Sequence, residues 1–350
     1  MQMRQNSPLC AKKYRLGLDG FEILNYNREK LGEHSPFVSH AARACRTCAP
    51  AWGLTLKLAG FCRHGRESTV DRIRRNERLA AMTRILVESP NKIFTLGTFC
   101  DMFGAAKSTL SEDIDILRGV FAQFHLGQLD TVTGAAGGVR FRPVPSPEDA
   151  CRAVRELAQM LAAPGRVLPG GFIYMADILA MPDVVEKMGT IIASQFYRAE
   201  PDFVLTMETK GIPVAMMTAR ALGVPMVIVR RDSKVYEGPA VNINYLAGSG
   251  GRVETMSLSR RAVKEGQRAL IVDDFMRAGN TARGMVDMMR EFSVTVVGVC
   301  VLIATQEPAR KRLDGVKSLL VIDSTDESTG TAVIRPANWL CTAAEKAAAR

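Results

Sequence analysis

The segment Leu270-Ile-Val-Asp-Asp-Phe-Met-Arg-Ala-Gly-Asn-Thr281 indicates the fold of the larger part of this chain. Its apolar start predicts a buried strand, Asp273 and Asp274 stand where that strand ends, and a loop with Gly279 leads into a helix predicted to begin at Thr281. Loop amides and a helix N-terminus suit one phosphate, while two carboxylates suit sugar hydroxyls, directly or through Mg²⁺. The alternative is an acidic strand end with a solvated turn. The stretch favours a site for a ribose 5-phosphate group.

Apolar strands and helices alternate around this stretch. Helices are predicted at 148–162 and Pro213–Leu222, and strands at Phe203–Met207, Pro225–Val229, Ala269–Val272, Val294–Ile303 and Leu319–Ile322. This alternation predicts an α/β fold with a mainly parallel sheet and helices on both faces. Ligands bind such sheets beyond the carboxyl ends of the strands.

Two further loops follow predicted strands and belong at the same edge of the sheet. Thr209-Lys210-Gly211 offers amides and a cation to a diphosphate, and Arg230-Arg231 can add positive charge. Taken alone, the arginine pair fits a solvated surface better. The glycine-rich stretch from Val235 to Glu254 is predicted to form a flap over the ligand.

Residues 70–145 have the pattern of a small DNA-binding domain. The expected elements are a helix ending near Glu88, a helix at Leu96–Phe103 capped by Thr95, a third helix after Gly104 capped by Ser108 or Ser111 with Glu112, and strands at Leu129–Thr133 and Gly138–Arg142. Three helices and a hairpin in this order predict a winged helix-turn-helix domain, with the third helix in the major groove.

The residues expected to contact DNA gather at the start of this domain, at the start of its third helix and on its hairpin. They are Arg72, Arg74, Arg75, Arg78, Lys107, Ser108, Thr109, Ser111 and Arg140. The alternative is a helical dimerisation or linker module, because ten basic and eight acidic residues leave the domain a modest net charge.

Length and charge divide the chain further. The 350 residues fit two domains at roughly 150 residues each. Pro143-Val-Pro-Ser-Pro147 predicts a stiff linker between the DNA-binding domain and an effector domain at 148–340. The net charge of +10 indicates a polyanionic partner, but +6 of it belongs to residues 1–69. The case for DNA therefore rests on where the charges lie.

Residues 1–69 are left unassigned. They hold four of the eight cysteines but show no sustained helical or strand period. Cys45, Cys48, Cys62 and His64 offer four zinc ligands, yet the second pair has atypical spacing and no metal site is predicted. A disordered extension is one alternative. Translated sequence upstream of a true start near Val70 is the other, and it is favoured.

Composition excludes several classes. No apolar run approaches the roughly 20 residues of a membrane helix. The N-terminus does not have the order of a secretory signal, and eight cysteines in a chain of this length do not make a disulfide scaffold. We therefore expect a cytoplasmic, nucleoid-associated protein with no membrane partner.

The stretch around Asp273 resembles the binding motif of type I phosphoribosyltransferases, which bind phosphoribosyl diphosphate. Together with the winged helix, it resembles the purine operon repressor family of Gram-positive bacteria from about Asp71 to about Ile322. The matching segments are Ala106–Asp113, Val132–Val139, Ile173–Leu179, Thr209–Pro213, Ile243–Tyr245, Thr255–Leu258 and Ile271–Met276.

This resemblance implies a homodimeric repressor that binds paired operator sites upstream of purine biosynthesis genes. Phosphoribosyl diphosphate is the implied inducer, with or without Mg²⁺, and it lowers DNA affinity. The transferase fold then acts as a sensor that has no catalytic residues and requires no cofactor. The implied ligand contacts are Asp273, Asp274, Phe275, Met276, Arg277, Ala278, Gly279, Asn280, Thr281, Thr209, Lys210, Gly211, Arg230, Arg231 and Tyr174.

Two positions depart from the family pattern. Asn280 stands where the family usually has glycine, and asparagine is tolerated there if the position needs a positive φ. Phe172 stands where the family usually has tyrosine, so a hydroxyl contact to the ligand is lost. Residues 1–69 match nothing in the family.

Two other functions remain as alternatives to the repressor. One is an active purine phosphoribosyltransferase of the xanthine type with an accessory domain, and the other is an activator at some promoters.

Overall fold

The computed structural model describes residues 73–134, 137–231, 238–247 and 252–342. Residues 71–350 form one compact unit, which holds both predicted domains. Residues 1–72 lie outside the described residues, and with them lie the cysteine and histidine ligands considered for zinc and the predicted DNA contact of Arg72. The described residues contain no group of three side chains suited to hold a metal ion.

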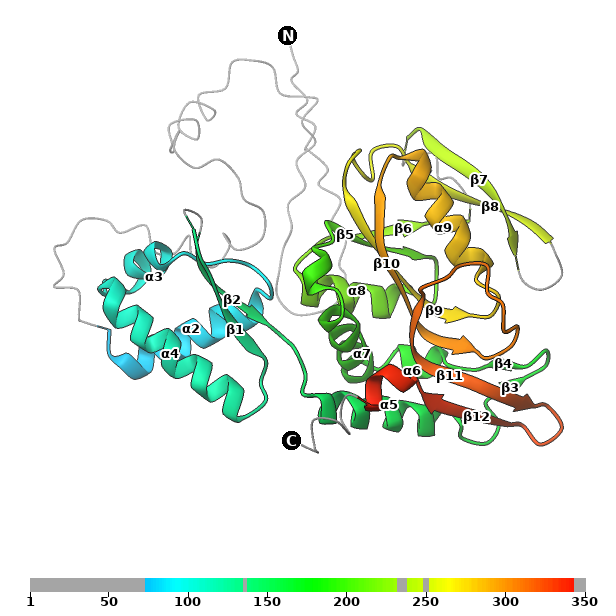
Figure 1. The fold of residues 1–350 in the computed structure, drawn as a ribbon, viewed down its shortest axis with the longest axis horizontal. Helices are drawn as coiled ribbons and strands as arrows, with labels where there is room; N and C mark the ends of the chain where they lie inside the picture. The colour runs from blue at the N-terminus through cyan, green and yellow to red at the C-terminus, as the bar shows by residue number, and fades with distance from the viewer. Residues whose placement is uncertain (1–72, 135–136, 232–237, 248–251, 343–350) are drawn as a thin grey trace, which may run out of the picture. The chain divides into compact units, whose positions relative to one another are not determined.

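The DNA-binding domain has the predicted order of elements (Figure 1). These are α2 (Arg75–Glu88), α3 (Leu96–Phe103), α4 (Lys107–Gln123), β1 (Gln128–Val132) and β2 (Gly138–Arg142). β1 and β2 pair antiparallel, and Phe94 adds a bridge to Val139. Its core is apolar and includes Met82, Leu86, Phe99, Leu110 and Phe121.

Of two predicted helix caps in this domain, one is confirmed and the other is wrong. The Thr95 hydroxyl accepts a hydrogen bond from the Thr98 amide at 3.1 Å, as predicted for the start of α3. The predicted caps of α4 are wrong, because its N-cap is Ala106. Gly104 turns the chain in the left-handed region, so the helix begins early and includes Ser108 and Ser111 in its first turns.

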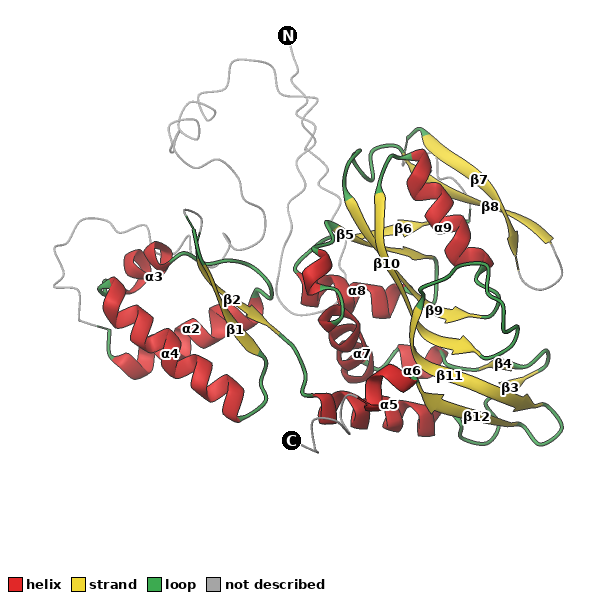
Figure 2. Cartoon of the chain, in the orientation of Figure 1, coloured by secondary structure: helices red, strands yellow, loops and turns green. Residues whose placement is uncertain are grey.

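The effector domain is built on a six-stranded sheet in the order β12-β11-β10-β9-β5-β6 (Figure 2). The strands are β5 (Phe203–Met207), β6 (Met226–Val229), β9 (Arg268–Met276), β10 (Thr295–Thr305), β11 (Lys317–Asp326) and β12 (Thr331–Pro336). Neighbours pair parallel except β11 and β12, which pair antiparallel. The predicted α/β class is confirmed, with an antiparallel edge strand that the sequence patterns do not predict.

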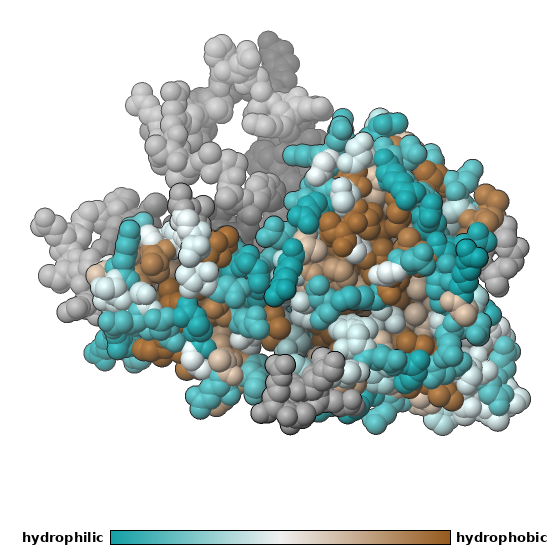
Figure 3. All heavy atoms as spheres, viewed as in Figure 1, coloured by the Kyte–Doolittle hydropathy of each residue, from teal (hydrophilic) through white to brown (hydrophobic). Residues whose placement is uncertain are grey.

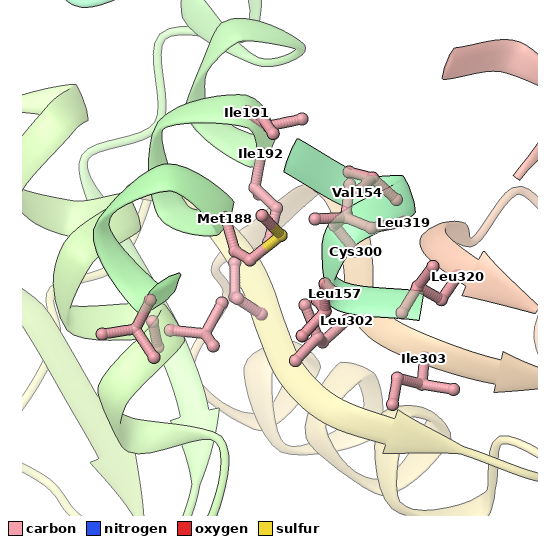
Figure 4. Close-up of a cluster of buried hydrophobic side chains, with 14 of the residues drawn as sticks. Val154, Leu157, Met188, Ile191, Ile192, Cys300, Leu302, Ile303, Leu319 and Leu320 are labelled. Atoms are coloured by element: carbon pink, nitrogen blue, oxygen red, sulfur yellow. The ribbon is translucent and has the colours of Figure 1, made fainter. Parts of the chain in front are cut away.

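Both faces of this sheet are buried, as predicted. One face packs against α5 (Pro147–Leu161), α6 (Ala176–Leu179), α7 (Pro182–Ser194) and α8 (Ile212–Leu222). Figure 4 shows part of this cluster, with Val154 and Leu157 of α5, Met188 of α7 and Leu302 of β10 among its labelled side chains. The other face packs against α9 (Asn280–Glu291).

A second hairpin lies where the glycine-rich flap is predicted. β7 (Ala240–Ala247) and β8 (Arg252–Ser259) pair antiparallel, and Ser257 bridges to Arg230 beyond β6. Tyr245 and Met256 belong to the same core cluster as α9. The hairpin is therefore anchored to the domain by apolar side chains.

Two small features complete the effector domain. β3 (Val167–Leu168) and β4 (Phe172–Ile173) form a short hairpin before α6, and η3 (Tyr197–Ala199) follows α7. A disulfide joins Cys151 of α5 to Cys341 after β12. Spacing does not predict this pair, which is separated by 190 residues. No helix in the described ranges is both long and apolar enough to span a membrane.

Candidate functional site

Two neighbouring carboxylates lie near the carboxyl end of β9, Asp273 buried and Asp274 half-buried. Asp273 is 7% exposed, and its Oδ1 accepts a hydrogen bond from the Asp274 amide at 3.0 Å. Burial raises the pKa of Asp273 well above its usual value, and the charge of Asp274 raises it further. Burial also raises the pKa of Asp274, although a hydrogen bond with Asp273 and the Lys210 cation both act to lower it. Such a pair favours hydroxyl donors or a cation as its partner.

The loop after these carboxylates encloses a cavity of about 240 Å³ at the start of α9. The cavity is lined by Phe172, Asp273, Phe275, Met276, Arg277, Ala278, Gly279, Asn280, Thr281, Ala282 and Val301. Gly279 is the N-cap of α9 and has a φ of 86°. Asn280 is already helical, so the positive φ that would favour asparagine belongs to Gly279 instead. The cavity has the phosphate-binding features expected of a loop and helix start.

Two residues missed by the sequence reasoning hold this loop in place. The Lys311 Nζ donates to the carbonyl oxygens of Arg277 and Thr305, each at 2.7 Å. The Arg312 amide donates to the Ala278 carbonyl at 2.8 Å. Burial lowers the pKa of Lys311. Only the basic run at 310–312 could have drawn attention to this support, and such runs usually lie on solvated surfaces.

The predicted diphosphate loop meets the carboxylate pair. Gly211 is buried, and a Cβ added to it would lie 2.4 Å from both the Asp273 Oδ1 and the Thr206 Oγ1. Thr209 and Lys210 are exposed beside it. The structure therefore brings together the two loops that the sequence predicts for one ligand, and only glycine fits their closest approach.

Acidic residues that the sequence reasoning missed hold the predicted arginine pair. Glu208 accepts from the Arg231 amide at 2.6 Å and pairs with Arg230 at 3.4 Å. Glu254 of β8 pairs with Arg231 and accepts from the Tyr245 hydroxyl, both at 3.0 Å. Burial, followed by the hydrogen bond to Glu254, raises the pKa of Tyr245 to about 12. These contacts link the diphosphate loop to the β7–β8 hairpin.

Tyr174, a predicted ligand contact, does not line the phosphate cavity. Tyr174 is 46% exposed, and its carbonyl accepts from Arg166. Among the described residues of this segment, Phe172 lines the cavity, and it is 56% exposed. An exposed aromatic ring thus stands at the edge of the phosphate loop.

The predicted DNA contacts divide into exposed and internal residues. Lys107, Ser108 and Ser111 are exposed at the start of α4, Thr109 is half-buried there, and Arg74 is exposed before α2. Arg78 does not fit the prediction, because its side chain is buried and its Nε donates to Asp113 at 2.8 Å.

Two other predicted contacts are partly engaged within the domain. Arg75 pairs with Glu112 and Asp113 and is half-exposed. The Arg140 Nε lies 3.6 Å from the Asp130 carboxylate, and the side chain is 20% exposed. The start of α4 is consequently the most accessible polar surface among the predicted contacts.

Fold and site define the class: a winged-helix DNA-binding domain joined to a phosphoribosyltransferase-type domain. Residues 74–143 match the family described as "Bacterial purine repressor, N-terminal", and residues 176–333 match the "Phosphoribosyl transferase domain" family. The chain belongs to the bacterial purine repressor family.

Its relatives support this membership. The purine biosynthesis transcriptional repressor PurR of Bacillus subtilis is 42% identical over 269 residues, which are 77% of this chain and 94% of the relative. The purine biosynthesis transcriptional activator PurR of Lactococcus lactis is 41% identical over 73% of this chain and 94% of its own length. The family thus contains both repressors and activators of purine biosynthesis genes.

Two further comparisons each cover about half of the chain. Xanthine phosphoribosyltransferase of Deinococcus deserti is 30% identical over 52% of this chain and 98% of the relative. The crystal structure of adenine phosphoribosyltransferase from Thermoanaerobacter pseudethanolicus is 24% identical, with a TM-score of 0.41, over 47% of this chain and 95% of that one.

Proposed function

We propose that this protein is a DNA-binding repressor of purine biosynthesis genes whose inducer is phosphoribosyl diphosphate. One observation carries the proposal: Gly211 of the diphosphate loop touches Asp273 beside the phosphate cavity, in a chain that also holds a winged helix. A single ligand with a 5-phosphate, two ribose hydroxyls and a diphosphate would occupy the phosphate cavity, the carboxylates and the diphosphate loop together. The transferase-type domain then acts as a sensor.

Each part of the ligand has chemically matched partners in this proposal. The loop Arg277–Thr281 receives the 5-phosphate, because its amides and the start of α9 favour an anion. Asp273 and Asp274 receive the ribose hydroxyls. Thr209, Lys210 and the arginines after β6 receive the diphosphate, for which Glu208 must release the Arg230 guanidinium and Glu254 must release that of Arg231.

The carboxylate pair also fits a Mg²⁺ ion bound together with the ligand. Two adjacent carboxylates with raised pKa values gain from a divalent cation, and Mg²⁺ commonly binds through carboxylates plus substrate phosphates. The ion would offset the charge repulsion between the diphosphate and the two aspartates.

Repression requires that DNA and ligand favour different arrangements of the protein. Phosphoribosyl diphosphate must bind the arrangement with low DNA affinity more tightly than the DNA-bound one. The start of α4, with Lys107, Ser108 and Ser111 exposed, would enter the major groove. A cytoplasmic, nucleoid-associated location follows from operator DNA as the partner.

We propose that the protein works as a homodimer on paired operator sites. Ile116 and Val120 of α4 and Phe124 at its C-cap recur every four residues and are 40%, 38% and 61% exposed. Figure 3 shows hydrophobic residues at the surface among hydrophilic ones. Such exposed apolar side chains are available for a second copy. Sedimentation equilibrium of the free protein tests the dimer, and a monomer at micromolar concentration would refute it.

A gel shift on DNA from upstream of purine genes tests the main proposal. We expect binding at about 0.05 M salt and release when phosphoribosyl diphosphate and Mg²⁺ are added. Asp274→Ala should leave DNA affinity intact and abolish release. A complex that persists at saturating ligand, or the absence of any complex at low salt, would contradict the proposal.

The similarity to a xanthine phosphoribosyltransferase supports an alternative function, that of an active purine phosphoribosyltransferase. Sensor and enzyme need the same phosphate contacts, so the loops do not separate them. Diphosphate release measured with xanthine, guanine, hypoxanthine and adenine separates them, and turnover with one base would establish the enzyme. Because one relative is a transcriptional activator, repression must also be distinguished from activation. Reporter fusions measured with and without the gene make this distinction.

A further inference from the structure

Helix α8 begins in the candidate effector site and ends against the winged-helix domain. Its N-cap is Gly211, the last residue of the diphosphate loop, and its last residue is Leu222. Eleven residues at 1.5 Å rise span about 16 Å. One helix therefore connects the place where the diphosphate would bind with the domain that would bind DNA.

Close packing makes α8 a rigid element. Val214, Ala215 and Thr218 are fully buried. A Cβ added to Gly189 of α7 would lie 2.6 Å from the Met217 Cβ, so the two helices touch almost backbone to backbone. Since interiors packed in this way transmit displacement rather than absorb it, a shift at Gly211 reaches the other end of α8.

The far end of α8 is held by two side chains. The last carbonyls of a helix have no partner within the helix. Here the Asn91 Nδ2 donates to the Leu222 carbonyl at 2.8 Å, and the Tyr197 hydroxyl donates to the Ala221 carbonyl at 3.1 Å. Asn91 belongs to the turn between α2 and α3 of the DNA-binding domain.

Asn91 is also fixed within its own domain. Its φ is 59°, in the left-handed region. Its amide donates to the Phe141 carbonyl at 2.6 Å, and its Oδ1 accepts from the Arg142 Nε at 3.3 Å. The Arg142 guanidinium lies 4.9 Å from the centre of the Tyr197 ring. Asn91 thus connects β2, the second strand of the predicted wing, directly to the end of α8.

We infer that Asn91 couples the effector site to the DNA-binding domain, as a positioning residue that acts through α8. This inference rests on the proposed function and adds its route of regulation. When the diphosphate loop closes on its ligand, α8 moves as a body and the bond from Asn91 to Leu222 carries the movement to β2. DNA affinity then changes without any contact between ligand and DNA.

Asn91→Asp is the sharpest test. The change keeps the size of the side chain, an oxygen for Arg142 and tolerance of a positive φ, and it removes the donor to Leu222. We expect the operator Kd without effector and the effector Kd each to stay within about twofold of wild type. The factor by which saturating phosphoribosyl diphosphate raises the operator Kd should fall about fivefold.

A matched control uses the same helix. Arg220 lies on the exposed side of α8 and pairs with Glu186 of α7. Arg220→Gln should keep the full release factor. An unchanged release factor in Asn91→Asp, or an equal fall in both variants, overturns the role of Asn91.

Amide hydrogen exchange without DNA separates this inference from the inducer proposal. Saturating phosphoribosyl diphosphate should change the protection of the Asn91 amide in the wild-type protein and leave it unchanged in Asn91→Asp. If the wild-type protein stays on its operator while this exchange responds, the inducer proposal fails and the coupling stands. If the exchange of the wild-type protein does not respond, the coupling fails.

Discussion

Arg78 and Asp113 form a buried ion pair that joins α2 to α4: the Arg78 Nε donates to the Asp113 Oδ2 at 2.8 Å. Asp113 has no exposed surface, and Arg75 contacts its other oxygen at 3.0 Å. The Arg78 Nη1 also donates to the Ile73 carbonyl. Part of the arginine cluster before the first helix therefore stabilises the domain rather than contacting DNA.

Arg78→Met should lower the free energy of unfolding by about 3 kcal/mol, because it leaves a buried carboxylate with one partner fewer. Urea denaturation of the full chain measures this. Arg74→Ala is the control: it should change stability by less than about 0.5 kcal/mol while reducing the salt dependence of operator binding by about one ion. If Arg78→Met has normal stability but no longer binds the operator, Arg78 contacts DNA as the sequence predicts and does not stabilise the domain.

Gly211→Ala should abolish effector binding. The added methyl group would lie 2.4 Å from the Asp273 Oδ1 and the Thr206 Oγ1, so it forces the diphosphate loop away from β9 and β5. Calorimetric titration with phosphoribosyl diphosphate measures the loss, which we expect to exceed about 100-fold. Gly119→Ala provides a control, since α4 has open space there. Effector affinity within a few-fold of wild type in Gly211→Ala would refute the close approach.

The carboxylate pair should make the effector-free protein less stable as pH rises. The folded-state pKa of Asp273 is raised above the unfolded value near 3.9, so the folded protein holds this proton more tightly. The resulting stabilisation is fully present below pH 3.9 and is lost as pH rises through the folded pKa. One proton gives a slope of at most about 1.4 kcal/mol per pH unit.

Asp273→Asn tests that slope. The amide carries no charge, and it can donate to the Thr206 Oγ1, which has no hydrogen-bond partner among the described residues. Thermal unfolding without ligand should therefore show a higher Tm than wild type at pH 8 and little difference at pH 4. A Tm below that of wild type at both pH values would show that the charged pair stabilises the fold.

Much of this fold and site is predictable from local sequence. The apolar run before Asp273, the loop glycine and the Thr95 cap act within a few residues, so their patterns survive without tertiary context. β12 is not predicted, because an antiparallel edge strand shows weaker hydrophobic patterning than the central ones. The partners of Arg78 and Arg231 lie 35 and 23 residues away, and spacing does not specify such pairs.

Lys311→Met should weaken effector binding without unfolding the domain. Lys311 donates to the carbonyls of Arg277 and Thr305, and so ties the phosphate loop to the end of β10. Methionine keeps most of the buried stem but removes both bonds, so the loop loses its preorganisation for the phosphate. We expect about a tenfold rise in the Kd for phosphoribosyl diphosphate, measured by calorimetry, and a change in Tm of only a few degrees. Arg310→Gln, at an exposed neighbour, should leave the Kd unchanged. Equal effects of the two variants would mean that Lys311 acts only through its positive charge.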